Sequence, residues 1–305
     1  MAAFVPDLWL IATLAAAFLQ ALRFMVQKVL ASDRLSAAGA TFARFLYSAP
    51  LVAVLLVVYL AQSGQSLPRL SPLFWSFGLT GGLAQVLATV CVVRLFQSRN
   101  FAVGITLKKT EAILAVLVGL VLLGEGVSVA AFAAICLGVV GVILLSKPPQ
   151  SEMQGWRAMF NRGVALGLSA GLLFALSAVC YRGASLQLLV DDPLLRAGVT
   201  LSAVTLSQMV GMALWLRWRA PGEISAVWRA RGTAIWVGLF SMGGSFCWFL
   251  AFGLQTAALV KAVGQVELLF SLLISTLVFG ERSTRRETAG MALLCLSIVA
   301  LVLMR

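Results

Sequence analysis

The sequence predicts an all-α, polytopic membrane protein with ten transmembrane helices, arranged as two inverted five-helix repeats around a central cavity. Three observations predict this fold. Of the 305 residues, 61% are hydrophobic and 11% are charged, and the mean hydropathy is +1.00; soluble domains have about 45–50% apolar and about 25% charged residues. The apolar residues form unbroken runs long enough to cross a bilayer. The two halves of the chain also share a sequence pattern.

Ten apolar runs have the length of a membrane-spanning helix, which needs roughly 20 residues. In chain order they cover 8–29, 37–60, 73–96, 101–123, 127–146, 163–185, 194–217, 233–254, 257–279 and 287–304. The polar stretch 147–162 contains Pro148 and Pro149 and lies at the middle of the chain, which is typical of a linker. We therefore expect a first repeat at 1–146, a linker at 147–162 and a second repeat at 163–305.

The duplication is clearest in the fourth and ninth runs. The segment from Glu111 to Glu125 resembles the segment from Glu267 to Glu281 at a constant offset of 156 residues (267 − 111 and 281 − 125), and both end in Gly-Glu. A repeat of five helices places its copy upside down in the bilayer, an arrangement found in many carriers that work by alternating access. The glycines Gly124 and Gly280 are expected to end their helices in a left-handed turn.

Basic residues predict the orientation of the chain. The net charge is +12, and we interpret this excess as a topology signal rather than as a sign of nucleic-acid binding. Basic residues concentrate beside the odd-numbered loops, from Lys28 to Arg286, whereas Arg69, Arg182 and Arg305 lie on the opposite side. Because cytoplasmic loops are enriched in Lys and Arg, the odd-numbered loops are predicted to be cytoplasmic and both termini outside.

Charged residues near the middle of two runs are the main functional signal. The fourth run carries Lys108, Lys109 and Glu111, and the ninth carries Lys261, Gln265 and Glu267. A charge at the centre of a spanning helix costs roughly 2.5–3.5 kcal/mol on insertion scales, so such residues face a cavity or a partner. Two interpretations stay open: Glu111 and Glu267 bind substrate or a proton in a shared central cavity, or they only neutralise buried Lys and Arg.

Five further residues are candidates for the same cavity: Gln20, Arg23, Arg44, Gln85 and Trp248. The two arginines have the forked geometry that binds a carboxylate; alternatively, they extend toward a membrane interface or hold a glutamate. Trp248 is placed to stack on a substrate or to pack as an ordinary core residue.

The sequence does not favour catalysis. It contains no histidine, its five cysteines include no Cys-x-x-Cys pair, and no phosphate-binding loop, zinc spacing or Gly-x-Ser-x-Gly motif is present. We therefore expect no enzyme activity, no cofactor and no metal site.

The chain resembles the drug/metabolite transporter superfamily, in its ten-helix EamA-type branch. The features that carry this resemblance are the five-plus-five duplication, the length near 300 residues, and Gly124-Glu125 and Gly280-Glu281 before an apolar helix. The resemblance implies a basket of helices around a central cavity and secondary transport, often export, of amino acids and other metabolites across the bacterial inner membrane. Many relatives carry a proline in the fourth and ninth helices, which this chain lacks.

Basic residues within the runs outnumber acidic ones, which favours a negatively charged substrate. The bases are Arg23, Arg44, Lys108, Lys109, Arg196 and Lys261, against Glu111 and Glu267. We therefore predict a carrier for an amino acid or a related carboxylate, with a proton as candidate coupling ion, embedded in the lipid bilayer as a monomer or weak homodimer. The alternatives are an exporter or facilitator of cationic drugs or lipids, and a non-transporting membrane receptor or enzyme.

Overall fold

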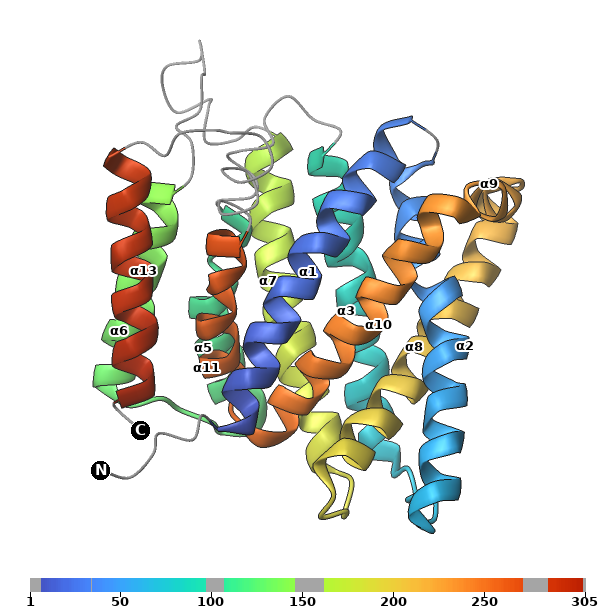
Figure 1. The fold of residues 1–305 in the computed structure, drawn as a ribbon, viewed down its shortest axis with the longest axis horizontal. Helices are drawn as coiled ribbons and strands as arrows, with labels where there is room; N and C mark the ends of the chain where they lie inside the picture. Colours follow the sequence, from blue (N-terminus) through green and yellow to red (C-terminus); the bar gives the residue numbers. More distant parts are fainter. Residues whose placement is uncertain (1–6, 34, 97–106, 146–161, 271–284, 304–305) are drawn as a thin grey trace.

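The structure, a computed structural model, describes residues 7–33, 35–96, 107–145, 162–270 and 285–303. Most of these residues are helical, and no strand occurs among them (Figure 1). The helices are α1 (Leu8–Asp33), α2 (Ala37–Ser63), α3 (Pro72–Phe96), α5 (Glu111–Leu123), α6 (Val129–Leu145), α7 (Arg162–Leu186), α8 (Pro193–Arg219), α9 (Glu223–Arg229), α10 (Arg231–Leu254), α11 (Ala257–Val263) and α13 (Arg285–Leu303), and a 3-10 helix covers Gly264–Val266.

Six of the described helices are long and apolar enough to cross a membrane, namely α1, α2, α3, α7, α8 and α10. Three more apolar helices, α5, α6 and the Thr288–Leu303 part of α13, are shorter. The prediction of an all-α, multi-pass membrane protein is therefore confirmed, whereas the count of ten spans is not. The predicted linker at 147–162 and the Gly280-Glu281 ending lie almost entirely outside the described residues.

The fourth and ninth runs are not the continuous helices that the sequence predicts. In the fourth, Leu107 and Lys108 end a helical stretch, Lys109 and Thr110 form a turn, and α5 begins at Glu111. In the ninth, the 3-10 helix separates α11 from a helical turn that begins at Glu267. The prediction of unbroken helices was wrong here because polar side chains at each break form their contacts with other helices.

Capping residues account for several helix boundaries. The hydroxyl of Ser36 accepts a hydrogen bond from the Gly39 backbone at the start of α2 (3.0 Å), and Asp192 accepts one from the Leu194 backbone at the start of α8 (2.9 Å). Such caps satisfy backbone donors that have no partner within the helix. Gly124 ends α5 with φ = 66°, as the sequence predicts.

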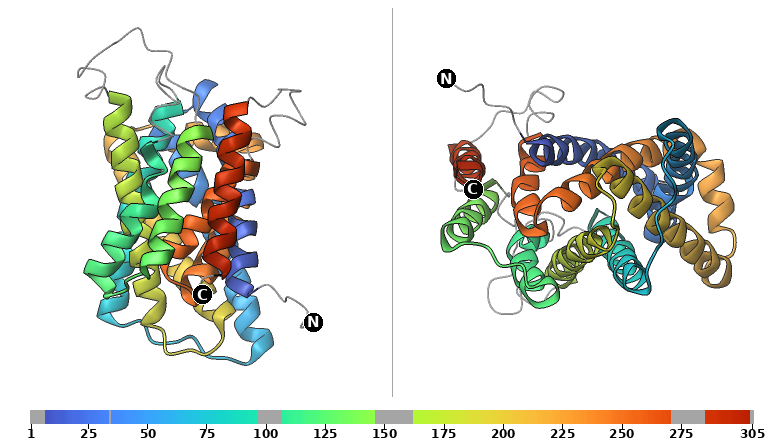
Figure 2. Two further views of the ribbon diagram at one scale, coloured as in Figure 1. Left: turned by 90° about the vertical axis from the view of Figure 1, so that its left-hand side faces the viewer. Right: turned by 90° about the horizontal axis from the view of Figure 1, so that it is seen from below.

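Helices from the two halves of the chain pack side by side. In the pair α6 and α13, which forms one edge of the bundle (Figures 1 and 2), Ser297 bonds to the Ala134 carbonyl and Arg286 to the Ile143 carbonyl, so the two helices are antiparallel. Helix α1 lies along α10, and α3 lies along α7. The α3–α7 approach is close: a Cβ added to Gly81 would meet the Cys180 Cβ at 2.9 Å.

The short helix α9 was not predicted. It lies across the end of the bundle between α8 and α10 (Figure 1). Its single acidic residue, Glu223, accepts a hydrogen bond from the Ser36 backbone (2.8 Å) and so ties α9 to the start of α2.

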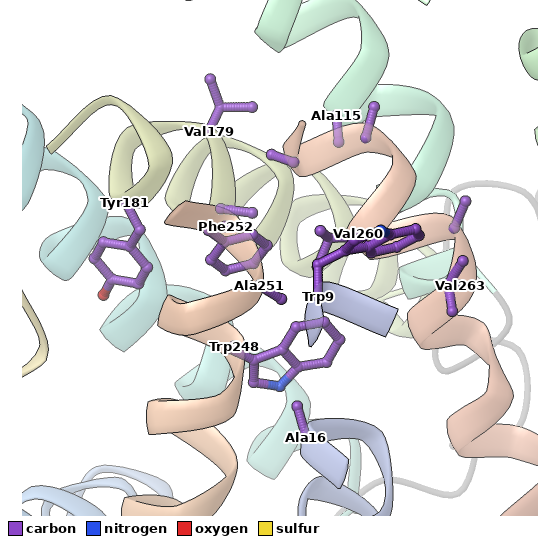
Figure 3. Packing of buried hydrophobic residues seen from close by; sticks show 14 of the residues in the cluster. Trp9, Ala16, Ala115, Val179, Tyr181, Trp248, Ala251, Phe252, Val260 and Val263 are labelled. Atoms are coloured by element: carbon purple, nitrogen blue, oxygen red, sulfur yellow. The ribbon is translucent and has the colours of Figure 1, made fainter. Parts of the chain in front are cut away.

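The largest apolar cluster surrounds the two breaks. Figure 3 shows Trp248 and Phe252 of α10 beside Val260 and Val263 of α11, with Trp9 and Ala16 of α1 against them. This packing holds α1, α10 and α11 together and so positions the polar groups that follow.

Candidate functional site

Three lysines and two glutamates form a buried charge cluster at the two helix breaks. Lys109 Nζ lies 2.9 Å from Glu267 Oε2, and Lys108 Nζ lies 4.0 Å from the same oxygen. Lys108 Nζ is also 3.7 Å from Glu111 Oε1, and Lys261 Nζ is 3.6 Å from Glu111 Oε2. All five residues are at most 7% exposed. Each glutamate stands at the first position after a break, where the partial positive charge of a helix N-terminus stabilises a carboxylate.

The two breaks also touch each other directly. The side-chain amide of Gln265 donates a hydrogen bond to the Lys109 carbonyl (3.1 Å), and these two residues are 156 positions apart. That spacing equals the offset between Glu111 and Glu267 in the sequence. Positions that the sequence alignment makes equivalent are therefore in direct contact.

A chain of hydrogen bonds links the cluster to a neighbouring cavity. Gln20 donates to Glu267 (2.9 Å) and accepts from the Trp248 indole (3.2 Å). The Lys261 ammonium lies 4.9 Å from the centroid of the Trp248 ring, a cation–π distance. Lys261 is therefore a member of the cluster that also lines the cavity, beside Gln20 and Trp248.

The cavity lies between α1, α2, α3, α7, α10 and α11. Its lining residues are Gln20, Arg23, Arg44, Gln85, Phe174, Ser177, Ala178, Tyr181, Phe240, Ser241, Gly244, Ser245, Trp248, Phe249, Phe252 and Lys261. Three of these are cationic and none is acidic, so the wall attracts negative charge. The cavity volume is about 30 Å³, space for about one water molecule, so this conformation is contracted.

The two arginines of the wall are buried and have neutral partners. Arg44 Nε donates to Ser241 Oγ (2.6 Å) and Arg44 Nη2 to Ser245 Oγ (2.9 Å). Arg23 Nη1 donates to Gln27 Oε1 (2.9 Å). Arg23 and Arg44 are 3% and 4% exposed, which contradicts the alternative that they extend to a membrane interface. Nor does either form a salt bridge with a described glutamate.

A second polar network closes the wall between α3, α7 and α8. The Tyr181 hydroxyl donates to Gln85 Oε1 (3.0 Å), and Gln208 donates to the same amide oxygen and to the Gly82 carbonyl. Buried hydrogen-bond networks of this kind hold side chains in one orientation, although the Gln208 Oε1 oxygen has no hydrogen-bond partner among the described residues. Gln85 is thereby held with its oxygen toward Tyr181.

A separate ion pair joins α7 to the loop after α5. Arg182 Nε lies 2.7 Å from both carboxylate oxygens of Glu125, and Arg182 Nη1 donates to the carbonyls of Phe252 and Gln255 (2.8 Å each). This one guanidinium therefore connects α7, the α5–α6 loop and the end of α10.

The structure divides the predicted site residues into two groups. Gln20, Arg23, Arg44, Gln85, Trp248 and Lys261 line the cavity. Lys108, Lys109, Glu111, Gln265 and Glu267 lie behind it, in the cluster and the contact between the breaks. In this conformation Glu111 and Glu267 contact lysines, and their binding of substrate or a proton stays a prediction.

Sequence reasoning missed the serines that hold Arg44. Ser241 and Ser245 are four residues apart and share one face of α10 with Gly244. A small polar stripe of this kind in an apolar run was the available signal. The aromatic wall formed by Phe174, Phe249 and Phe252 had none, because phenylalanine is common throughout the runs.

Comparisons with known proteins agree with this architecture. A solved structure described as "Crystal structure of protein" aligns with a TM-score of 0.72 over 96% of this chain and 96% of that chain, at 15% sequence identity. Identity this low shows a shared fold and nothing about function. The comparison with curated proteins found no match. The sequence of residues 7–147 matches the EamA-like transporter family. This match covers less than half of the 305-residue chain, so it shows that the first part of the chain is similar to a family of transporters.

Proposed function

We propose that the protein is a secondary transporter that moves a small carboxylate-bearing metabolite, an amino acid or a related carboxylate, by alternating access. The observation that carries this proposal is the cavity wall, which combines Arg23, Arg44 and Lys261 with aromatic side chains and, among the described residues, no acid. Arginine binds carboxylates through two parallel hydrogen bonds. The cationic wall argues against the alternative of a carrier for cationic drugs.

We infer that the mechanism uses two inverted repeats, at 1–146 and 163–305, joined by 147–162. Two features support this inference: the antiparallel pairing of α6 with α13, and the contact between Lys109 and Gln265 at the repeat offset. Broken helices near the membrane midplane are the usual substrate sites of inverted-repeat carriers. Exchanging the conformations of the two repeats would open the contracted cavity to one side and then to the other.

We place the protein in the bacterial inner membrane, with export as its direction and the α8–α9–α10 corner on the cytoplasmic side. Four exposed arginines, Arg217, Arg219, Arg229 and Arg231, gather at this corner, and the tryptophans Trp218 and Trp228 beside them are also exposed. Basic residues mark the cytoplasmic side, and tryptophans mark the membrane interface. This orientation is tested by labelling single cysteines at the corner in intact cells and in inverted vesicles.

The function is tested by counterflow in liposomes that contain the purified protein. Vesicles loaded with an unlabelled carboxylate should take up the same labelled carboxylate, and empty liposomes should not. Arg44→Gln should slow this exchange at least tenfold, whereas Arg217→Gln at the exposed end of α8 should not alter it. If a panel of amino acids and organic acids shows no exchange, while cationic dyes do exchange, the proposal is wrong.

The coupling ion is tested separately with the same vesicles. If a proton is the coupling ion, an imposed pH gradient should drive accumulation of the carboxylate above its outside concentration. Equal concentrations on both sides with and without the gradient would contradict proton coupling and leave exchange or facilitated diffusion as the mechanism.

A further inference from the structure

The charge around the cavity is poorly matched to a zwitterion. Five buried cations (Arg23, Arg44, Lys108, Lys109 and Lys261) face two buried carboxylates (Glu111 and Glu267), an excess of three positive charges among the described residues. A net charge held within a membrane is costly. A bound anion would reduce the excess, whereas a zwitterion would leave it unchanged.

The positions of the acids sharpen this argument. An amino acid bound in the cavity brings an ammonium group, which needs acceptors and is stabilised by a carboxylate. No described carboxylate lines the cavity. The two nearby glutamates already contact lysines, at 2.9 Å for Glu267 and 3.6 Å for Glu111. An ammonium group would instead lie in a wall that contains Lys261 and two guanidinium groups.

Arg23 and Arg44 form no salt bridge with a carboxylate of the described residues. A buried charge is stabilised by an opposite charge, and a charge with only neutral partners remains costly. Arg44 is fixed by two serine hydroxyls and Arg23 by a glutamine oxygen. These neutral groups orient the guanidinium groups without neutralising them. Among the described residues, neither guanidinium group pairs with a carboxylate, so an anion from outside the chain would be a suitable partner.

The rest of the wall indicates the body of that anion. Trp248 stacks on Phe252 with ring centroids 5.7 Å apart, and Phe249 lies 4.5 Å from the Tyr181 ring. All four aromatic residues line the cavity. Aromatic faces of this kind favour a flat, apolar group.

We propose that the substrate is an aromatic carboxylate without an amino group, bound with its carboxylate at Arg23 and Arg44 and its ring against the aromatic wall. This narrows the proposed transport function and rests on it. Lys261, which contacts Glu111 and also lines the cavity, adds a third positive charge to the anion site.

Three probes that share a phenyl ring and a two-carbon chain isolate the charged groups. They are 3-phenylpropanoate, which has only the carboxylate, phenylalanine, which has both groups, and 2-phenylethylamine, which has only the ammonium. Liposomes containing the full-length protein should transport 3-phenylpropanoate with at least tenfold higher apparent affinity than phenylalanine, and should not transport 2-phenylethylamine.

Variants then test the assigned contacts. Arg44→Gln and Arg44→Lys should both weaken 3-phenylpropanoate transport at least tenfold, because neither provides the guanidinium fork, while Arg217→Gln should behave as the wild type. A melting curve of each variant separates loss of binding from loss of folding, and the wild-type comparison of probes needs no variant.

The outcomes separate this inference from the broader function. Equal or better transport of phenylalanine would overturn the inference and leave the proposed transport of carboxylates intact. Transport of other organic acids without transport of 3-phenylpropanoate would overturn the aromatic part of the proposal. No exchange of any acid in the wider panel would overturn both.

Discussion

Removing the negative charge of Glu267 is the most informative single change in the charge cluster. The cluster contains three lysines and two glutamates, and Glu267 accepts hydrogen bonds from Lys109 and Gln20, both at 2.9 Å. Glu267→Gln leaves the Lys109 ammonium buried beside a neutral amide and raises the cluster's excess of positive charge from one to two. Removing one partner of a buried ion pair costs about 3–5 kcal/mol.

The loss should be visible in a melting curve of the purified protein in detergent. For a chain of this size each kcal/mol corresponds to about 2 °C in Tm, so Glu267→Gln is expected to melt roughly 6–10 °C below the wild type. The double variant Lys109→Met/Glu267→Gln returns the excess to one and should recover most of that loss. Lys109→Met alone leaves two lysines with two glutamates, so it should lower Tm the least of the three variants.

Two results would refute this reasoning. A Glu267→Gln variant that melts within about 2 °C of the wild type would mean that the cluster is hydrated or rearranged, so that its charges are not interdependent. A double variant that melts below both single variants would mean that the side chains stabilise the breaks by packing rather than by charge.

Three further predictions concern the surroundings of the site. Arg182→Gln removes the ion pair with Glu125 and two hydrogen bonds to carbonyls, so hydrogen exchange in the α5–α6 loop should accelerate; unchanged exchange would show that the loop is held by other contacts. Gly81→Val at the α3–α7 contact should lower the free energy of unfolding by about 1–3 kcal/mol, because a Cβ at this position meets the Cys180 Cβ at 2.9 Å. Gly211→Ala serves as the control, because a Cβ there meets no atom within 4 Å. Equal stability of the two variants would contradict the packing argument. Partial burial of Asp192 tends to raise its pKa, but the hydrogen bonds that it accepts hold the pKa below the usual 3.8. The ionised carboxylate therefore stabilises the fold above the unfolded-state pKa, and this contribution is lost as the pH falls through the lower folded-state pKa. The drop in Tm between pH 5 and pH 2.5 should be smaller in Asp192→Asn than in the wild type, and an identical drop would exclude this role.

The sequence predicted the helices well because long apolar runs have few alternatives in lipid. A span needs about 20 apolar residues with its backbone groups bonded internally, so α1, α2, α3, α7, α8 and α10 follow from run length alone. The short helix α9 could not be predicted from run length, because its position depends on the contact of Glu223 with the start of α2.

The breaks were predictable in position but not in form. Buried charges mark both, yet neither contains a proline, and Lys109 and Thr110 carry no turn signal. Gly264 is the one residue at the breaks whose type points to an unusual local structure. Any larger residue would clash there, because a Cβ would lie 2.4 Å from the Trp248 ring. That requirement comes from α10, which is distant in sequence.

The role of individual side chains in the site was the least predictable part. Sequence reasoning identified Glu111 and Glu267 as intramembrane acids but could not determine whether they face the cavity or the lysines. That choice depends on how Lys109 and Lys261 approach them from different elements. Arg23 and Arg44 were identified as possible carboxylate ligands, whereas the serines that orient Arg44 were found only from the packing of α2 against α10.

The central claim is that the contracted cavity between the two halves opens to each side of the membrane in turn. Ser177 lines this cavity and is 2% exposed, so it reports directly on access. The decisive measurement is the labelling of Ser177→Cys, in an otherwise cysteine-free chain that retains transport, with a membrane-impermeant thiol reagent applied from each side in turn. The account predicts labelling from both sides and protection by the transported carboxylate. Labelling from one side only, or from neither during active exchange, would contradict it.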